Sequence, residues 1–403
     1  MRDNLARGEL LGRRIERSAL PFGRHHWVRC DETPAIDIAT PVQTRDAVTD
    51  WFEQRGNTPV DPEHGPHWHL GVLPIEGYGT AVTLVASHTV IDGLGLCLAL
   101  ADAVNGVTSE HVYPAPHSRR RRQAIAEDAR QTLRGMPDVA RALGGLVTLA
   151  VSNPPSRGAS DGRPRGRKAR RALDRPVAVP TATVYIDLAE WDACAQRLGG
   201  TSNALLAGFA AKLAQGYGRL RADGLVTLSY PVNDRGDNDI RANALKGIDF
   251  TVDPAPVTSD LRRIRNDFKR TIAAGLGKFA EQERVFPLTP FVPTAVVRKL
   301  PLASVNGADL PVGCSNFGEI DTLAAHVDGT AADYFTVRMV EQNLTALSPE
   351  LASGELYMTS GRVCGKLFIS FRAYLPGADN SREALLRNVE AALAAFGMAA
   401  FTE

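Results

Sequence analysis

The chain has 403 residues, of which 44% are hydrophobic and 23% charged, so it is long enough for two lobes of a soluble globular protein. Its formal net charge is +1, so no overall field favours a nucleic acid, and we expect no nucleic-acid partner. The five cysteines are scattered without a metal-binding spacing, which favours reduced thiols. The N-terminal segment is charged, unlike a signal peptide, and the longest apolar run (142–151) is too short to cross a bilayer. We therefore expect a cytoplasmic monomer, compatible with peripheral contact with a membrane surface.

The first part of the chain, residues 1–152, is predicted to be a mixed α/β lobe. Residues 67–90 predict two strands joined by a turn around Gly77 and Gly79. Helical spacing of apolar residues is found in four segments, 9–18, 44–56, 94–106 and 119–150.

The segment 153–180 is predicted to be a linker, because it is basic and rich in proline and glycine. A second α/β lobe is predicted over 181–403. Its strands are expected in four segments, 182–188, 224–235, 310–321 and 354–375. Its helices are expected in three segments, 188–218 (two helices separated at Gly199-Gly200), 260–276 and 381–398.

The stretch "SHTVIDG" (87–93) is the main chemical motif, because it places His88 at the end of a predicted strand. A neutral imidazole can accept a proton at physiological pH, so His88 is either a general base or a buried structural histidine. A buried carboxylate at Asp92 requires a cationic partner. Gly93 allows close approach of a ligand or a positive φ.

Beyond this motif, the chain resembles the thioester-dependent acyltransferases that carry an HHxxxDG motif, such as chloramphenicol acetyltransferase and the condensation domains of peptide synthetases. It looks closest to the bacterial wax ester synthase/diacylglycerol acyltransferase branch. The resemblance rests on several stretches in the same order, "GPHWHLGVL", "RGRKARRALDR", "LGGTSNALLAGFAAKL", "SYPVNDR" and "CSNFGEI". Ser87 replaces the first motif histidine, and Ala204 replaces a usual aspartate, whereas Asn203 and Asn233 are retained as motif neighbours.

This resemblance implies a fold of two chloramphenicol-acetyltransferase-like α/β lobes, each with two layers, arranged as a pseudo-dimer. The active site is then expected at the lobe junction, in a tunnel open from two faces. The implied reaction moves an acyl group from CoA or a phosphopantetheinyl carrier protein to a hydroxyl of a small-molecule or lipid acceptor. His88 would be the general base, without a covalent intermediate, a permanently bound cofactor or a metal.

The resemblance also implies supporting roles for residues of both lobes. Asp92 is expected to form a structural salt bridge with Arg235, which would fix the loop that carries His88. The backbone at Gly93, the hydroxyl of Ser315 and the amide of Asn316 are candidates for stabilising the oxyanion.

Two other functions stay open at this point. One is amide formation by a free-standing enzyme like a condensation domain. The other is a degenerate, non-catalytic family member that recruits a partner, which Ser87 and Ala204 favour and the retained His88, Asp92 and Arg235 disfavour.

Three further patterns have both a functional and a structural interpretation. His64, His67 and His69 could bind zinc, but no cysteine or acid completes the set, and partly exposed strand residues are the simpler interpretation. The basic runs 118–122 and 163–171 could attract CoA phosphates, a carrier protein or anionic lipids, or could be solvated surface. The amphipathic stretch 124–151 could lie on a membrane or cover a sheet.

Overall fold

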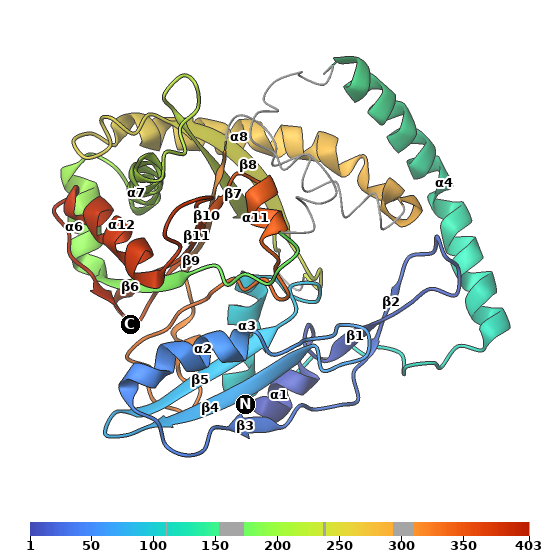
Figure 1. The fold of residues 1–403 in the computed structure, drawn as a ribbon. Coiled ribbons are helices and arrows are strands. Elements are labelled where there is room, and N and C mark those ends of the chain that lie inside the picture. The colour runs from blue at the N-terminus through green and yellow to red at the C-terminus, as the bar shows by residue number, and fades with distance from the viewer. Residues whose placement is uncertain (110, 153–172, 237–238, 293–309, 403) are drawn as a thin grey trace.

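The computed structural model describes residues 1–109, 111–152, 173–236, 239–292 and 310–402 (Figure 1). Most of the predicted linker, with the basic run 163–171, lies outside the described residues. In the described parts of the chain, no helix is both long and apolar enough to span a membrane.

A seven-stranded sheet dominates the second part of the chain, in the order β12-β6-β11-β10-β9-β7-β8. Strand β9 runs parallel to its neighbours β10 and β7, and the other pairs are antiparallel. The strands are β6 (Thr181–Asp187), β7 (Val226–Asn233), β8 (Leu245–Val252), β9 (Val312–Glu319), β10 (Glu355–Val363), β11 (Lys366–Tyr374) and β12 (Phe401–Thr402).

Helices cover one face of this sheet and bury the larger hydrophobic core. Helix α7 lies in the middle, and the side chains of 204–211 are all buried. Thr201 caps this helix by accepting a hydrogen bond from Ala204 N. The helices of this part are α6 (Leu188–Arg197), α7 (Ser202–Gly216), α8 (Arg262–Glu283), α11 (Leu347–Leu351) and α12 (Arg382–Ala394).

The first part of the chain forms a three-stranded sheet in the order β3-β4-β5, with a separate two-stranded ribbon β1-β2. The predicted hairpin over 67–90 is confirmed, and Gly77 and Gly79 both have positive φ in its turn. The elements are α1 (Arg2–Arg7), β1 (Arg13–Glu16), β2 (His26–Arg29), β3 (Ile36–Ile38), η1 (Arg45–Ala47), α2 (Val48–Gly56), β4 (Trp68–Ile75), β5 (Gly79–Ala86), α3 (Gly93–Val104) and α4 (Arg121–Ser152).

The helix predicted over 9–18 is wrong, because Arg13–Glu16 is strand β1. Ile15 pairs with Trp27 of β2, and the guanidinium of Arg13 lies 4.1 Å from the centroid of the Trp27 ring. Burial of one side of this two-stranded ribbon favours the strand, although the spacing of apolar residues is that of a helix. The short helix α1 lies just upstream.

The two sheets share a core, so the halves of the chain are interlocked. Ile320, Ala324 and Phe368 pack into the same buried cluster as Trp68 and Leu100 of the first half. The fold therefore places the end of β9 directly against the region that carries the SHTVIDG motif.

The segment 335–346 also joins the halves. It crosses the face of the large sheet that the helices leave free, where Thr336 bonds to Ser370 of β11 and Thr359 of β10 donates to Val337 O. Farther along, Gln342 Nε2 donates to the carbonyl oxygens of Gly56 at 2.8 Å and Thr58 at 2.7 Å.

Helix α4 extends along one side of the molecule (Figure 1) and is attached through a buried carboxylate at its start. Asp128 is 1% exposed and accepts hydrogen bonds from Ser18 Oγ at 2.6 Å, Ala19 N at 2.8 Å and Arg119 Nη1 at 2.8 Å. His26 Nε2 also lies 2.8 Å from Oδ1 of Asp128. Burial opposes ionisation, but these bonds outweigh it and lower the pKa of Asp128 to about 2.

We predict that Asp128→Ala lowers the free energy of unfolding by about 2–3 kcal/mol at pH 7, because four polar groups lose their buried partner. The pKa of Asp128 is depressed, so this contribution is present above the unfolded pKa near 4. It disappears as pH falls from about 4 to about 2. Denaturant unfolding of both proteins at several pH values measures the difference.

The matched control is Asp138→Ala, which removes a partly exposed carboxylate on the same helix, 2.8 Å from Arg141. We expect it to change stability by less than about 0.5 kcal/mol. Equal effects of the two substitutions would contradict the anchoring role of Asp128.

Candidate active site

The SHTVIDG motif forms the turn between β5 and α3. Ser87 is buried, its N–H donates to His67 O at 2.9 Å, and its own carbonyl accepts from Val90 N at 3.0 Å. The side chain of His88 is exposed at the tip of this turn. Among the described residues, no group hydrogen-bonds to its imidazole. His88 is therefore not a buried core histidine, and its ring is open to a ligand.

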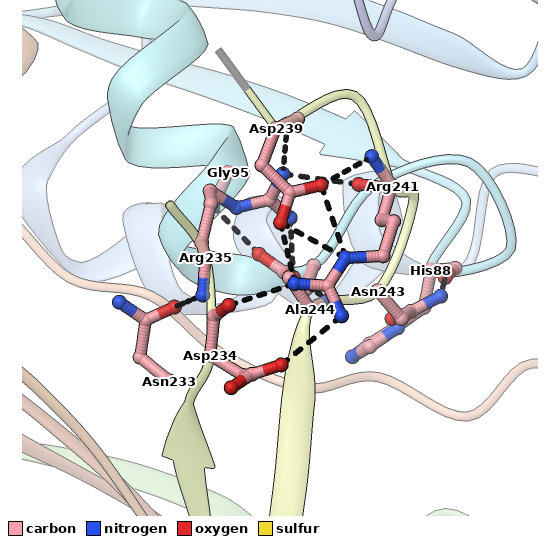
Figure 2. A network of polar contacts seen from close by, with 10 residues as sticks. His88, Gly95, Asn233, Asp234, Arg235, Asp239, Arg241, Asn243 and Ala244 are labelled. Atoms are coloured by element: carbon pink, nitrogen blue, oxygen red, sulfur yellow. Dashed lines mark hydrogen bonds and ion pairs between the residues drawn. The ribbon is translucent and has the colours of Figure 1, made fainter. Parts of the chain in front are cut away.

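Asp92 is the opposite case, with 1% exposure at the N-terminus of α3. Its Oδ1 caps the helix by accepting from Gly95 N at 2.7 Å. Its Oδ2 lies 2.6 Å from Arg235 Nη2, and both side chains of this ion pair are almost fully buried. The ion pair expected for these two residues is thus present, and it links the two halves of the chain. Figure 2 labels Gly95 and Arg235, the partners of the two oxygens of this carboxylate.

The segment 242–244, just before β8, runs along the motif. Ala242 O accepts from Asp92 N at 2.9 Å, and Ala244 N donates to Asp92 Oδ2 at 2.9 Å. Between them, Asn243 Nδ2 donates to His88 O at 3.0 Å (Figure 2). Three consecutive residues from the second half therefore hold the turn that presents His88. Sequence reasoning missed them, because "ANA" carries no chemical signal.

Arg235 is itself held by the loop between β7 and β8. Its Nη1 donates to the carbonyl oxygens of Asp239 at 2.8 Å and Arg241 at 3.0 Å, and its N–H donates to Asn233 Oδ1 at 3.0 Å. Asn233, expected as a motif neighbour, therefore shapes the strand end from which Arg235 projects. Together with the bond to Asp92, the two carbonyl oxygens engage both terminal nitrogens of the buried guanidinium, whereas its Nε has no hydrogen-bond partner among the described residues.

Gly93 is the first residue of α3 and lies against Phe317 of β9. A Cβ atom at position 93 would stand 2.6 Å from Cε1 of the Phe317 ring. Its φ is not in the left-handed region. Close packing of the two halves, rather than unusual backbone, is what requires glycine here.

The residues next to Phe317 on β9 bond to other elements. Asn316 Nδ2 donates to Asn203 Oδ1 at 2.8 Å, so two of the expected site residues are brought together at the start of α7. Ser315 is buried, and its hydroxyl bonds to the hydroxyl of Tyr357 on β10. Burial raises the pKa of Tyr357, although the bond to Ser315 acts in the opposite direction, so the phenol stays protonated at neutral pH.

No hydrogen bond joins His88 to Ser315 or Asn316 in the described structure. Two hollows in the described structure each hold about one water molecule (about 10 Å³), and His88 lines neither. These hollows therefore do not form the tunnel that the sequence led us to expect. One of them lies between the large sheet and Arg338, beside Tyr357.

The histidines considered for zinc are held separately. His67 and His69 are buried, 1% and 7% exposed, which corrects the expectation of partly exposed residues. His67 Nε2 lies 2.8 Å from Leu11 O, and His69 Nδ1 lies 2.6 Å from Arg55 Nη2. Burial lowers the pKa of both imidazoles. Within the described ranges, no cluster of three or more potential metal ligands is found.

Comparison with known proteins identifies the fold. No family model matches the sequence, and no curated protein matches it. Among solved structures, the chain has the two-lobed α/β fold of condensation domains.

The first condensation domain of the calcium-dependent antibiotic synthetase, in complex with a substrate analogue, is one such structure. It is 15% identical, with 100% of this chain and 87% of that chain aligned at a TM-score of 0.54. Polyketide synthase associated protein 5 from Mycobacterium tuberculosis is also 15% identical, with 96% of this chain and 86% of that chain aligned at a TM-score of 0.50.

We predict that Asp92→Asn and Arg235→Ala each lower the free energy of unfolding by about 3–5 kcal/mol, because each leaves a buried charge without its partner. The double variant should be less destabilised than the sum of the two, since the charges are lost together. Denaturant unfolding of the four proteins measures the coupling.

The pair Asp192–Arg362, 2.8 Å apart and partly exposed, is the matched control, with an expected coupling below about 1 kcal/mol. Strict additivity of the Asp92 and Arg235 substitutions would show that the two side chains do not interact in solution.

We also predict that Gly93→Ala lowers stability by about 1–3 kcal/mol, because its Cβ overlaps the Phe317 ring. The double variant Gly93→Ala/Phe317→Ala should be less than additive. Gly135→Ala in α4 is the control, since a Cβ there meets nothing within 4 Å and alanine favours the helix. Equal changes in thermal stability for the two glycine substitutions would refute this account of Gly93.

Proposed function

We propose that the protein is an acyltransferase that moves an acyl group from a CoA or carrier-protein thioester to a hydroxyl acceptor, with His88 as general base. One observation carries the proposal. An exposed imidazole, to which no described residue hydrogen-bonds, stands on a turn that a buried ion pair and the segment 242–244 hold at the junction of the two halves. A general base needs this combination of a rigid support and an accessible ring.

In the proposed reaction, an acceptor hydroxyl gives its proton to the imidazole of His88 while its oxygen attacks the carbonyl carbon of the thioester. The tetrahedral intermediate carries an oxyanion on the former carbonyl oxygen. When it collapses, the C–S bond breaks and the imidazolium returns the proton to the leaving sulfur. The products are an ester and a free thiol, and no acyl group is attached to the protein.

The oxyanion needs donors placed in advance, each of which can lower the barrier by about 3 kcal/mol. The Ser315–Tyr357 pair has two hydroxyl protons and uses one of them in the bond between the two hydroxyls. The amide of Asn316 has a second N–H beyond the one donated to Asn203. Ser315 and Asn316 project from opposite faces of β9, so we propose one of these two groups as the donor, and Asp92 and Arg235 as structural residues.

Amide formation is the second candidate, because structures of the same fold include a condensation domain bound to a substrate analogue. An amine would then replace the hydroxyl as nucleophile, with the same role for His88. The wax ester synthase-like stretches of the sequence favour the hydroxyl acceptor instead.

We predict that His88→Ala reduces acyl transfer by about 10²–10⁴-fold, which is the usual contribution of a general base. The assay uses the full chain with a panel of acyl-CoA and carrier-bound thioesters and mixed alcohols and amines, with products read by mass spectrometry. Esters would support the first candidate, and amides the second.

The control is His64→Ala, which removes another exposed histidine, 3.1 Å from Asp61, and should leave turnover unchanged. A folded His88→Ala protein with full turnover would rule out His88 as the base. If the wild type gave no product across the panel, a non-catalytic, partner-recruiting role would be favoured. The serine at position 87, in place of the first motif histidine, also suggests this role.

A further inference from the structure

Helix α4 leaves four large apolar side chains exposed, and they follow one line along its surface. Leu133 is 69% exposed, Leu143 54%, Met136 44% and Ile125 39%. At about 100° per residue they fall within an arc of about 80°, with Ala129 and Ala140 between them. We call these six residues the α4 stripe. It covers about 27 Å of helix, at 1.5 Å per residue.

The α4 stripe is distinct from the side of the helix that packs against the body. Asp128 makes the bonds described above, and Val139 and Ala142 pack against Leu288 of η2 (Phe286–Phe291). These buried positions lie on a neighbouring sector of the helix, so the packing of α4 is satisfied without the stripe. Isolated exposed apolar residues are common, but a contiguous line of them marks a binding surface.

The other border of the α4 stripe is basic. Arg130, Arg134 and Arg141 are exposed and follow one another along that flank. Arg141 also pairs with Asp138 at 2.8 Å. Two more arginines, Arg121 and Arg122, begin the helix. An apolar line beside a row of arginines is the arrangement of helices that lie in the interface of anionic membranes.

We propose that the α4 stripe binds an anionic lipid surface, with Leu133 and Met136 entering the acyl boundary and the arginine flank reaching phosphate headgroups. Charge complementarity favours this occupant over a second copy of the chain. In an antiparallel pair of α4 helices the arginine flanks would face each other, and like charges repel. The proposal is independent of the acyl-transfer chemistry.

Vesicle sedimentation with the full chain tests it, with phosphatidylglycerol/phosphatidylcholine mixtures against pure phosphatidylcholine. We expect binding to the anionic vesicles that weakens as salt rises from about 0.1 to 0.5 M. The double variant Leu133→Asp/Met136→Asp should lose at least about tenfold in binding. Arg130→Gln/Arg134→Gln should lose binding to anionic vesicles only.

Val112→Asp is the matched control, because this loop residue is 84% exposed and lies outside α4, nine residues before its start. It should bind as the wild type does. Circular dichroism and thermal unfolding show that each variant is folded. The proposal is overturned if the wild type binds neither vesicle, or if the stripe variant binds as well as the control. A wild-type dimer that the stripe variant dissociates, without vesicle binding, would identify a second copy as the occupant instead.

Discussion

The buried carboxylate of Asp92 is the interaction on which the arrangement of the candidate site depends. A charge in this position is tolerated only with a cation and hydrogen bonds around it. Arg235 Nη2, Gly95 N and Ala244 N supply them, and they come from both halves of the chain, Gly95 from α3 and the other two from the loop between β7 and β8. The same carboxylate therefore starts helix α3, connects the two halves and fixes the turn that ends in His88.

A second set of contacts makes the junction specific. Phe317 fills the space that the missing side chain of Gly93 leaves, and the segment 335–346 crosses from the large sheet to α2. The ion pair determines which groups meet, whereas the ring contact determines how closely they approach. The ring of His88 is exposed and no described residue hydrogen-bonds to it, whereas the polar groups of Asp92, Arg235 and Asn243 hold the turn.

Much of the fold follows from the sequence, because the apolar periodicity of segments such as α7 and the β4–β5 hairpin is strong. The segment expected as a helix over 9–18 contains strand β1 instead, because the buried Arg13 makes a cation–π contact with Trp27 of the neighbouring strand. The spacing of apolar residues carries no information about such a contact. The pairing of Asp92 with Arg235 was expected from the family resemblance. Ala242, Asn243 and Ala244 could not be predicted, because two of them act through backbone atoms and the third through a single amide.

The contacts of the segment 242–244 have a consequence for how this family of folds can vary in sequence. Two of its three bonds to the motif use the main chain, so the side chains at positions 242 and 244 are free of any role in those bonds. Conservation of the residues that support His88 would then be apparent at Asp92 and Arg235 but hardly apparent at Ala242 and Ala244. A comparison of sequences would find the part of this support that side chains make and would miss the part that the main chain makes at positions 242 and 244.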